Sequence, residues 1–131
     1  MATFVDTSAL LTLLNRSETN HQAALNAWER LVDSREVLIT SSFVLVETYA
    51  LLQSRLGLEA VRTMHDEITP LLDVQWVDQA TFAAGASGLL LAARRQLSLV
   101  DCVSFVLMRT LGIDTAFAWD RHFTDQGFAL V

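Results

Sequence analysis

The sequence predicts an α/β fold in which a central, mostly parallel sheet of four to five strands lies between two layers of helices. Short apolar runs rich in β-favouring residues alternate along the chain with longer segments of helical periodicity. This alternation is typical of parallel sheets, because the helices that join parallel strands cover both faces of the sheet. The chain of 131 residues shows no internal repeat and no linker, so we expect one domain, residues 1–131.

The first predicted strand is Thr3–Val5, and an aspartate, Asp6, follows it at once. Thr7 or Ser8 is expected to cap the helix that begins near Ala9. We expect this strand to be central in the sheet. Asp6 would then lie at the carboxyl end of the sheet, where open α/β proteins bind their ligands.

The later helices are predicted where apolar residues recur every three to four positions, and the later strands where short apolar runs stand between polar residues. Serine, aspartate, glycine and proline mark the expected boundaries. The helices are His21–Val32, Ser41 or Ser42 to about Leu56, Leu58–Ile68, Asp78 to near Arg95, and Leu99–Leu111. The strands are Val37–Ile39, Val74–Trp76, Thr115–Ala118 and Phe128–Leu130.

The composition narrows the class of protein. A hydrophobic content of 52% suggests apolar surface beyond the core, yet no apolar run reaches the ~18 residues that span a bilayer. No signal peptide is evident, and a single cysteine, Cys102, fits a reducing cytosol, so we expect a cytoplasmic protein without a membrane segment. The net charge of −6 argues against a simple electrostatic grip on nucleic acid, unless the acids converge on metal ions.

Three further acids stand at informative positions. Glu47 lies within the apolar stripe of its helix and is expected to point inward, although an acid at the edge of such a stripe also reaches water or pairs with arginine. Asp101 begins a helix that is apolar nearly all round, and Ser98 three residues earlier equally suggests a capping box. Asp120 follows a strand as Asp6 does, a position that an ordinary turn aspartate also takes.

Asp6, Glu47, Asp101 and Asp120 are therefore the candidates for a shared site, and Asp125 in its turn sequence is a minor one. His122 is isolated from other histidines and cysteines, which disfavours zinc, and we expect it to be packed or exposed. Carboxylates without such partners select Mg²⁺ or Mn²⁺. Two carboxylates ~5 Å apart repel by roughly 3 kcal/mol at an effective dielectric constant of about 20, so a cluster of four should depend on a divalent ion.

Four short motifs in this order resemble those of PIN-domain nucleases, and within that family those of the VapC toxins of type II toxin–antitoxin modules. The likeness covers essentially the whole chain. The motifs are Val-Asp-Thr-Ser at residues 5–8, Glu47, Leu-Ser-Leu-Val-Asp-Cys-Val-Ser-Phe at residues 97–105, and Phe-Ala-Trp-Asp-Arg-His-Phe at residues 117–123 with Gly-Phe after it.

The resemblance implies a PIN-like three-layer α/β/α fold, a homodimer, and neutralisation by a small antitoxin. It also implies that Asp6, Glu47, Asp101 and Asp120 form the catalytic set that cuts RNA, with Mg²⁺ or Mn²⁺ on Asp6, Asp101 and Asp120. Many relatives carry threonine or serine two residues before the last acid. This chain has Ala118 there and lacks that hydroxyl.

The hypothesis is metal-assisted hydrolysis of phosphodiester bonds in single-stranded RNA or an RNA loop. Arg94, Arg95 and Arg121 are candidates for contacts with flanking phosphates, although solvated surface arginines are about as common. An aspartate-based phosphatase is a weaker alternative, because such enzymes usually carry a second acid two residues after the nucleophilic aspartate, and this chain has Ser8 at that position. The third interpretation is a non-catalytic domain that binds a protein partner. The small residues at 83–88 are equally typical of a packed protein interface and of a buried helix.

Overall fold

Five parallel strands form one sheet in the order β3-β2-β1-β4-β5, so the first strand of the chain is its centre. The computed structural model describes all residues, Met1–Val131. Phe4 lies in register with Ile39 on one side and with Ala116 on the other. The strands are β1 Ala2–Val5, β2 Val37–Ser41, β3 Asp73–Gln75, β4 Thr115–Phe117 and β5 Ala129–Leu130.

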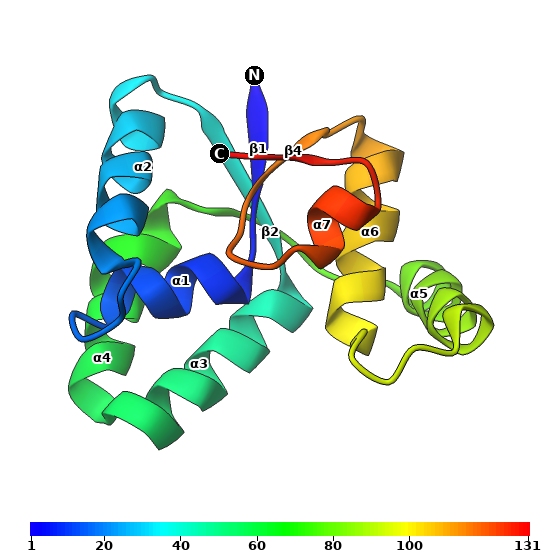
Figure 1. Ribbon diagram of the computed structural model, residues 1–131, viewed down its shortest axis with the longest axis horizontal. Helices are drawn as coiled ribbons and strands as arrows, with labels where there is room; N and C mark the ends of the chain where they lie inside the picture. The colour runs from blue at the N-terminus through cyan, green and yellow to red at the C-terminus, as the bar shows by residue number, and fades with distance from the viewer.

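Helices flank the sheet on both sides, which confirms the predicted three-layer arrangement. They are α1 Thr7–Leu14, α2 His21–Asp33, α3 Ser42–Leu56, α4 Leu58–Thr63, α5 Gln79–Ala92, α6 Leu99–Leu111 and α7 His122–Asp125. Figure 1 shows α1, α2 and α4 on the left of the strands, α3 beneath them and α5 to α7 on the right. Both β1 and β2 run downward in this view, and each passes directly into a helix at the lower edge of the sheet.

Two local expectations differ from the structure. Asp6 itself caps α1, because its side chain accepts a hydrogen bond from the Ser8 amide and the helix begins at Thr7. The helix expected over Leu58–Ile68 is α4 followed by one π-helical turn, Met64–Ile68, and a 3-10 turn then takes in Pro70. Proline is tolerated there because the first turn of a helix leaves its N–H groups without intrahelical partners.

The last helix before β4, α6, is buried as its apolar sequence predicts. Its residues Val103 and Met108 are fully enclosed, and Phe105 packs edge-to-face on Phe123 of α7 with ring centroids 5.1 Å apart. Asp101 in its first turn is also buried. Because α6 is held on several sides, its amino-terminal turn is a rigid support for that carboxylate.

The small-residue helix α5 is neither a buried helix nor uniformly exposed. Gly85 is its one buried residue, and it contacts Val103 of α6, whereas Leu90 and Leu91 are 78% and 87% exposed. These exposed leucines, together with Val46 and Trp76, confirm the expected apolar surface beyond the core. No helix is long and apolar enough to cross a membrane.

Gly85→Ala is expected to destabilise the protein by about 1–3 kcal/mol, because an added methyl group overpacks a close helix contact. A Cβ at this position would lie 2.5 Å from Val103 Cγ2 and 3.1 Å from the Val103 backbone nitrogen, so the two helices would have to separate. Gly88→Ala is the matched control, since nothing lies within 4 Å of its Cβ position. Because alanine has a better helix propensity than glycine, Gly88→Ala should raise the free energy of unfolding of the protein by about 0.5–1 kcal/mol. Urea unfolding measures both, and equal effects would contradict the packing argument.

Candidate active site

Asp6 lies at the carboxyl end of the central strand, where its side chain caps the first turn of α1. Its Oδ2 accepts hydrogen bonds from the Ser8 amide at 3.1 Å and from Ser8 Oγ at 2.6 Å, and its Oδ1 has no protein donor. Burial raises the pKa of Asp6 to about 7, against the opposing effect of the Ser8 hydrogen bonds. The negative charges of Asp101 and Asp120 raise it further, which places both acids near Asp6.

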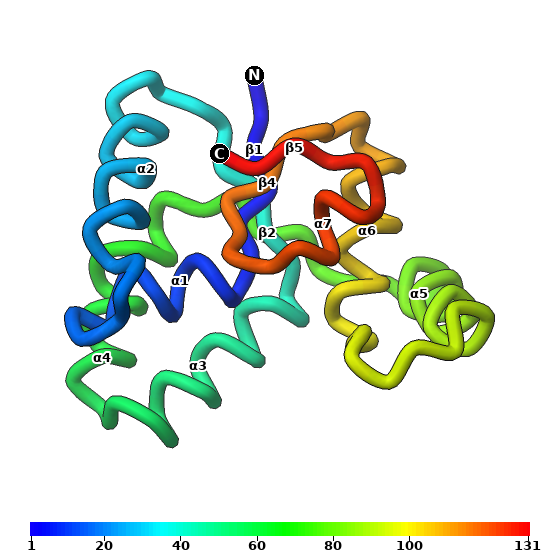
Figure 2. The backbone as a smooth tube through the Cα atoms, viewed as in Figure 1, coloured from blue at the N-terminus to red at the C-terminus, as the bar shows by residue number.

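Ser8 joins the first helix to the loop after β4. Its hydroxyl donates to Asp6 and accepts from the Trp119 amide at 2.8 Å, a contact between residues far apart in the sequence. The backbone path in Figure 2 shows this loop crossing in front of the lower ends of β1 and β2 before it enters α7. No sequence pattern predicts this contact, because the sequence alone marks Ser8 only as a possible helix cap. The Ser8 hydroxyl therefore lies beside the loop that contains Ala118, the position where many relatives carry a hydroxyl and this chain does not.

Glu47 lies on the second turn of α3 and is half-buried, in agreement with its inward-facing position in the sequence pattern. Burial is the main cause of its raised pKa, and the charges of Asp101 and Asp120 add to the effect. The Thr7 side chain lowers the pKa by hydrogen bonding. Glu47 is thus drawn from a different helix toward the same two aspartates.

Asp101 forms the capping box that the sequence suggested, and it also joins the acidic cluster. Its amide donates to Ser98 Oγ at 3.0 Å, and its Oδ2 accepts from the Ser98 amide at 3.3 Å. Its pKa is raised chiefly by burial and then by the charge of Asp120, while Ser98 and His122 work in the opposite direction. The structural and the cluster interpretations of this residue therefore hold together.

Asp120 occupies the turn between β4 and α7. Its Oδ1 accepts from the His122 amide at 2.9 Å, the local hydrogen bond expected of a turn aspartate. A ligand atom from each of Asp101, Asp120 and His122 lies within 4.8 Å of the other two. Asp101 from α6 and Asp120 from the β4–α7 turn therefore lie close together, and their charges act on Asp6, after β1, and on Glu47, in α3.

His122 has neighbours that the sequence alone does not indicate. Its side chain is largely packed, and its Nδ1 lies 3.0 Å from Asp120 Oδ1 and 3.6 Å from Asp101 Oδ2. The cause is the short helix α7, which was not predicted and which turns the side chain back toward the acids. A histidine two residues after a strand-end aspartate was the available signal.

The donor atoms fit a divalent cation. Apart from His122, no basic side chain lies within 4.0 Å of the acids, since the remaining ion pair joins Arg62 to Glu59. Asp6, Asp101 and Asp120 each use one carboxylate oxygen in a hydrogen bond to the protein and leave the other without a donor. Free carboxylate oxygens gathered without a neutralising arginine are the environment that Mg²⁺ and Mn²⁺ favour.

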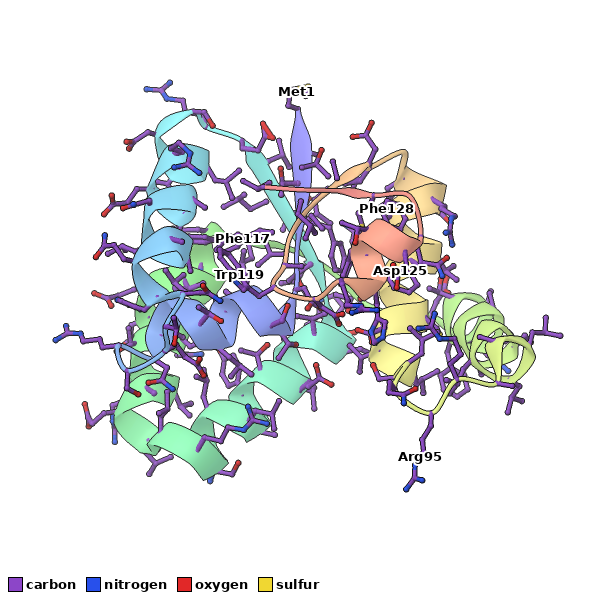
Figure 3. All side chains as sticks on the ribbon, in the orientation of Figure 1. Met1, Arg95, Phe117, Trp119, Asp125 and Phe128 are labelled. Atoms are coloured by element: carbon purple, nitrogen blue, oxygen red, sulfur yellow. The ribbon has the colours of Figure 1, made fainter.

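The candidate RNA-binding arginines fall in two places. Arg121 follows Asp120 and lines a hollow of about 270 Å³ together with Trp119 and Asp120. Arg94 and Arg95 lie exposed in the connection between α5 and α6, and Figure 3 shows Arg95 extending into solvent. Arg121 is therefore next to the acids in the chain, whereas the other two stand on the segment that leads into the helix of Asp101.

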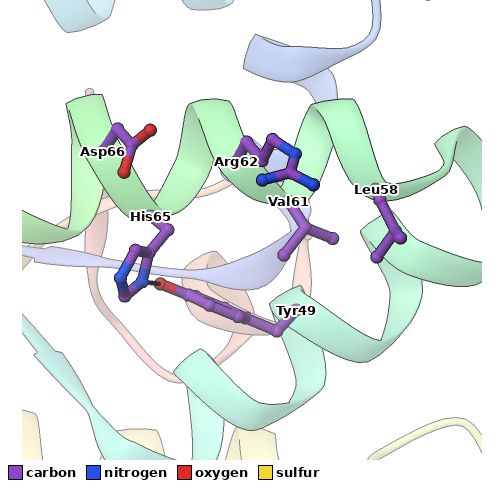
Figure 4. A pocket seen from close by; sticks show the side chains of 6 residues that line it. All are labelled: Tyr49, Leu58, Val61, Arg62, His65 and Asp66. Atoms are coloured by element: carbon purple, nitrogen blue, oxygen red, sulfur yellow. Dashed lines mark hydrogen bonds between the residues drawn. The ribbon is translucent and has the colours of Figure 1, made fainter.

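A separate hollow of about 330 Å³ lies between α3 and α4 (Figure 4). Tyr49 crosses it, with its hydroxyl 2.9 Å from His65 Nδ1 and 2.8 Å from Thr69 Oγ1. None of the four candidate acids lines this hollow. The chemistry-bearing residues therefore gather at the carboxyl end of the sheet and not in this cavity.

Comparison with known proteins agrees with this arrangement. The family model of the PIN domain matches residues 3–129. The chain belongs to the PIN-domain family. This PIN domain is 33% identical over 129 residues to the protein named 23S rRNA-specific endonuclease VapC20 of Mycobacterium tuberculosis strain H37Rv, a match that covers 98% of this chain and 96% of the relative.

Solved structures share the fold of this PIN domain. The crystal structure of M. tuberculosis VapC20, described as a toxin that cleaves the sarcin–ricin loop, superposes with a TM-score of 0.83 and 34% identity and covers 98% of this chain and 97% of that one. VapBC2 from Rickettsia felis, bound to a DNA fragment from its promoter, superposes with a TM-score of 0.73 at 14% identity. The match covers 100% of this chain and 98% of that one. FitAcB from Neisseria gonorrhoeae superposes with a TM-score of 0.71 at 14% identity, and the match covers 98% of this chain and 95% of that one. The last two show the fold alone.

Proposed function

We propose that this PIN domain is a metal-dependent endoribonuclease and the toxin of a toxin–antitoxin module. The observation that carries the proposal is that acids from four separate elements act on one another. Asp101 and Asp120 bring ligand atoms within 4.8 Å of each other, and the charges of both raise the pKa of Asp6 and of Glu47. The likeness to VapC20, a named endonuclease, extends over nearly the whole chain and supports the same conclusion.

Each acid has a role that its surroundings favour. Asp6, which accepts two hydrogen bonds from Ser8 at the end of β1, would be the central metal ligand. Asp101 and Asp120 would complete the metal site with their free oxygens, and Glu47 from α3 would ligate the metal or orient the attacking water. Bound Mg²⁺ or Mn²⁺ would lower the pKa of a water molecule and offset charge on the leaving oxygen.

The substrate is RNA with an accessible single-stranded loop. VapC20 is named for 23S rRNA, and at 33% identity this chain is proposed to act on RNA of the same class. Splayed strands reach a recessed site more easily than a duplex does. We propose that Arg121, which lines a hollow with Asp120, contacts a phosphate there, and that the exposed Arg94 and Arg95 contact phosphates further along the strand. Such RNA is found in the cytoplasm, where we place the protein.

Two protein partners are part of the proposal. The named relative is a VapC protein, and the VapC toxins are paired with an antitoxin, which supports a cognate antitoxin for this chain. A homodimer is the proposed assembly. Exposed apolar side chains such as Val46, Leu58 and Leu91 offer surface that either partner would cover.

The test is incubation of the purified protein with total RNA and intact ribosomes, with Mg²⁺ or Mn²⁺ in one series and a chelator in the other. We expect discrete cuts that need the metal, with mapped ends concentrated in a loop of the large-subunit rRNA. Cleavage that continues in chelator would contradict the metal dependence. Absence of any new RNA ends with metal present would contradict the nuclease assignment.

A further inference from the structure

His122 carries the one buried side-chain nitrogen or oxygen that has no hydrogen-bond partner in this protein, its ring Nδ1. This atom stands between two carboxylates, 3.0 Å from Asp120 Oδ1 and 3.6 Å from Asp101 Oδ2. Buried polar atoms are nearly always paired, so an orphan at this position calls for a physical reason.

Neither neighbouring carboxylate gives Nδ1 a satisfactory hydrogen bond. Asp120 Oδ1 already accepts from the backbone amide of His122 at 2.9 Å, and the ring nitrogen approaches the same oxygen without hydrogen-bond geometry. Asp101 Oδ2 accepts from the Ser98 amide and is too distant from the ring. The nitrogen therefore stands beside both carboxylates, next to their hydrogen-bonded oxygens, and itself makes no hydrogen bond within the protein.

We infer that His122 Nδ1 is a further ligand of the divalent cation, beside Asp101 and Asp120, an inference that rests on the proposed function. One ligand atom from each of these residues lies within 4.8 Å of the other two, which is the convergence that shared coordination requires. The α7 helix fixes the side chain in this place, with Phe123 next to it fully buried.

An imidazole ligand changes which metal the site prefers. Mg²⁺ takes oxygen ligands and dehydrates reluctantly, whereas imidazole nitrogen suits the first-row transition metals. A site with three carboxylates alone would accept either ion with modest discrimination. The added nitrogen shifts the preference toward Mn²⁺, so this chain is a manganese-selective member of its class.

Pulsed electron paramagnetic resonance of the Mn²⁺-loaded full chain, without RNA, tests the contact directly. We expect nitrogen modulation from a coordinated imidazole in the wild type, its loss in His122→Gln, and its retention in His65→Gln, since His65 lies in the hollow crossed by Tyr49. Labelling the wild-type protein with ¹⁵N-histidine changes the modulation without any substitution, so the test does not depend on whether the variant folds.

Metal affinity gives the second readout. His122→Gln is expected to raise the Kd for Mn²⁺ about tenfold and the Kd for Mg²⁺ by no more than about threefold, whereas a merely structural role would weaken both equally. Bound Mn²⁺ without nitrogen modulation would overturn this inference and leave the nuclease proposal standing. Failure of the wild type to bind Mn²⁺ at all would overturn both.

Discussion

Asp6→Asn is expected to reduce metal-dependent RNA cleavage by at least about a hundredfold, since even outer partners of metal ligands cost 10–100-fold when they are removed. The asparagine side chain has the same shape and keeps an oxygen for the Ser8 amide and hydroxyl, which hold Asp6 at 3.1 and 2.6 Å. It lacks the negative charge that the cation requires. Initial rates of cleavage of a defined RNA, in matched Mn²⁺, measure the effect.

Asp125→Asn is the matched control, because Asp125 lies on α7 close to the cluster in sequence but is exposed and does not contribute to the raised pKa of Asp6. Figure 3 labels it on that helix. The Asp125→Asn variant should cleave RNA at the same rate as the wild type. Undiminished cutting by Asp6→Asn would refute the assignment, and so would an equal loss in both variants, which would indicate a general effect of charge.

The metal-free protein is expected to lose stability as the pH rises from about 4 to about 7. Asp6 has a pKa of about 7 when folded, raised from 3.8 by burial, so the unfolded chain releases its proton first and the folded state retains it over this window. The free energy of unfolding then falls by about 1.4 kcal/mol per pH unit, about 4 kcal/mol in all, and levels off above the folded pKa.

Urea unfolding at a series of pH values, in chelator, measures this slope. Asp6→Asn should flatten it, because the amide does not ionise, and the variant should be more stable than the metal-free wild type at neutral pH. Saturating Mn²⁺ should restore the stability of the wild type alone, since the ion binds the folded state. A pH profile that is the same in wild type and Asp6→Asn would show that Asp6 is not a strained buried carboxyl.

The parts of the fold that follow from local patterns were predictable from the sequence. The central strand, the parallel direction of the strands and the capped helices that begin at Ser42 and Leu99 follow from apolar periodicity and capping residues. The convergence of the acids was also predictable in outline. Asp6 and Asp120 follow neighbouring parallel strands, and such strands end at one edge of the sheet.

The contacts that depend on tertiary detail were not predictable. The α7 helix has only four residues, too few to show periodicity, so nothing indicated that His122 would turn back toward Asp101. The Ser8 hydroxyl that holds both Asp6 and the Trp119 amide depends on how the β4–α7 loop crosses β1. The close approach of Gly85 to Val103 likewise reflects helix packing and not a local preference of glycine.

Calorimetric titration of Mn²⁺ into the metal-free wild-type protein and into Asp6→Asn tests the central claim most directly, since a single acidic centre at the end of β1 predicts its outcome without reference to any RNA. We expect saturable heat and a higher melting temperature for the wild type, and neither for the variant. If the wild-type protein gives no binding heat and no gain in melting temperature, the four carboxylates do not form a metal centre and the chain is a binding module.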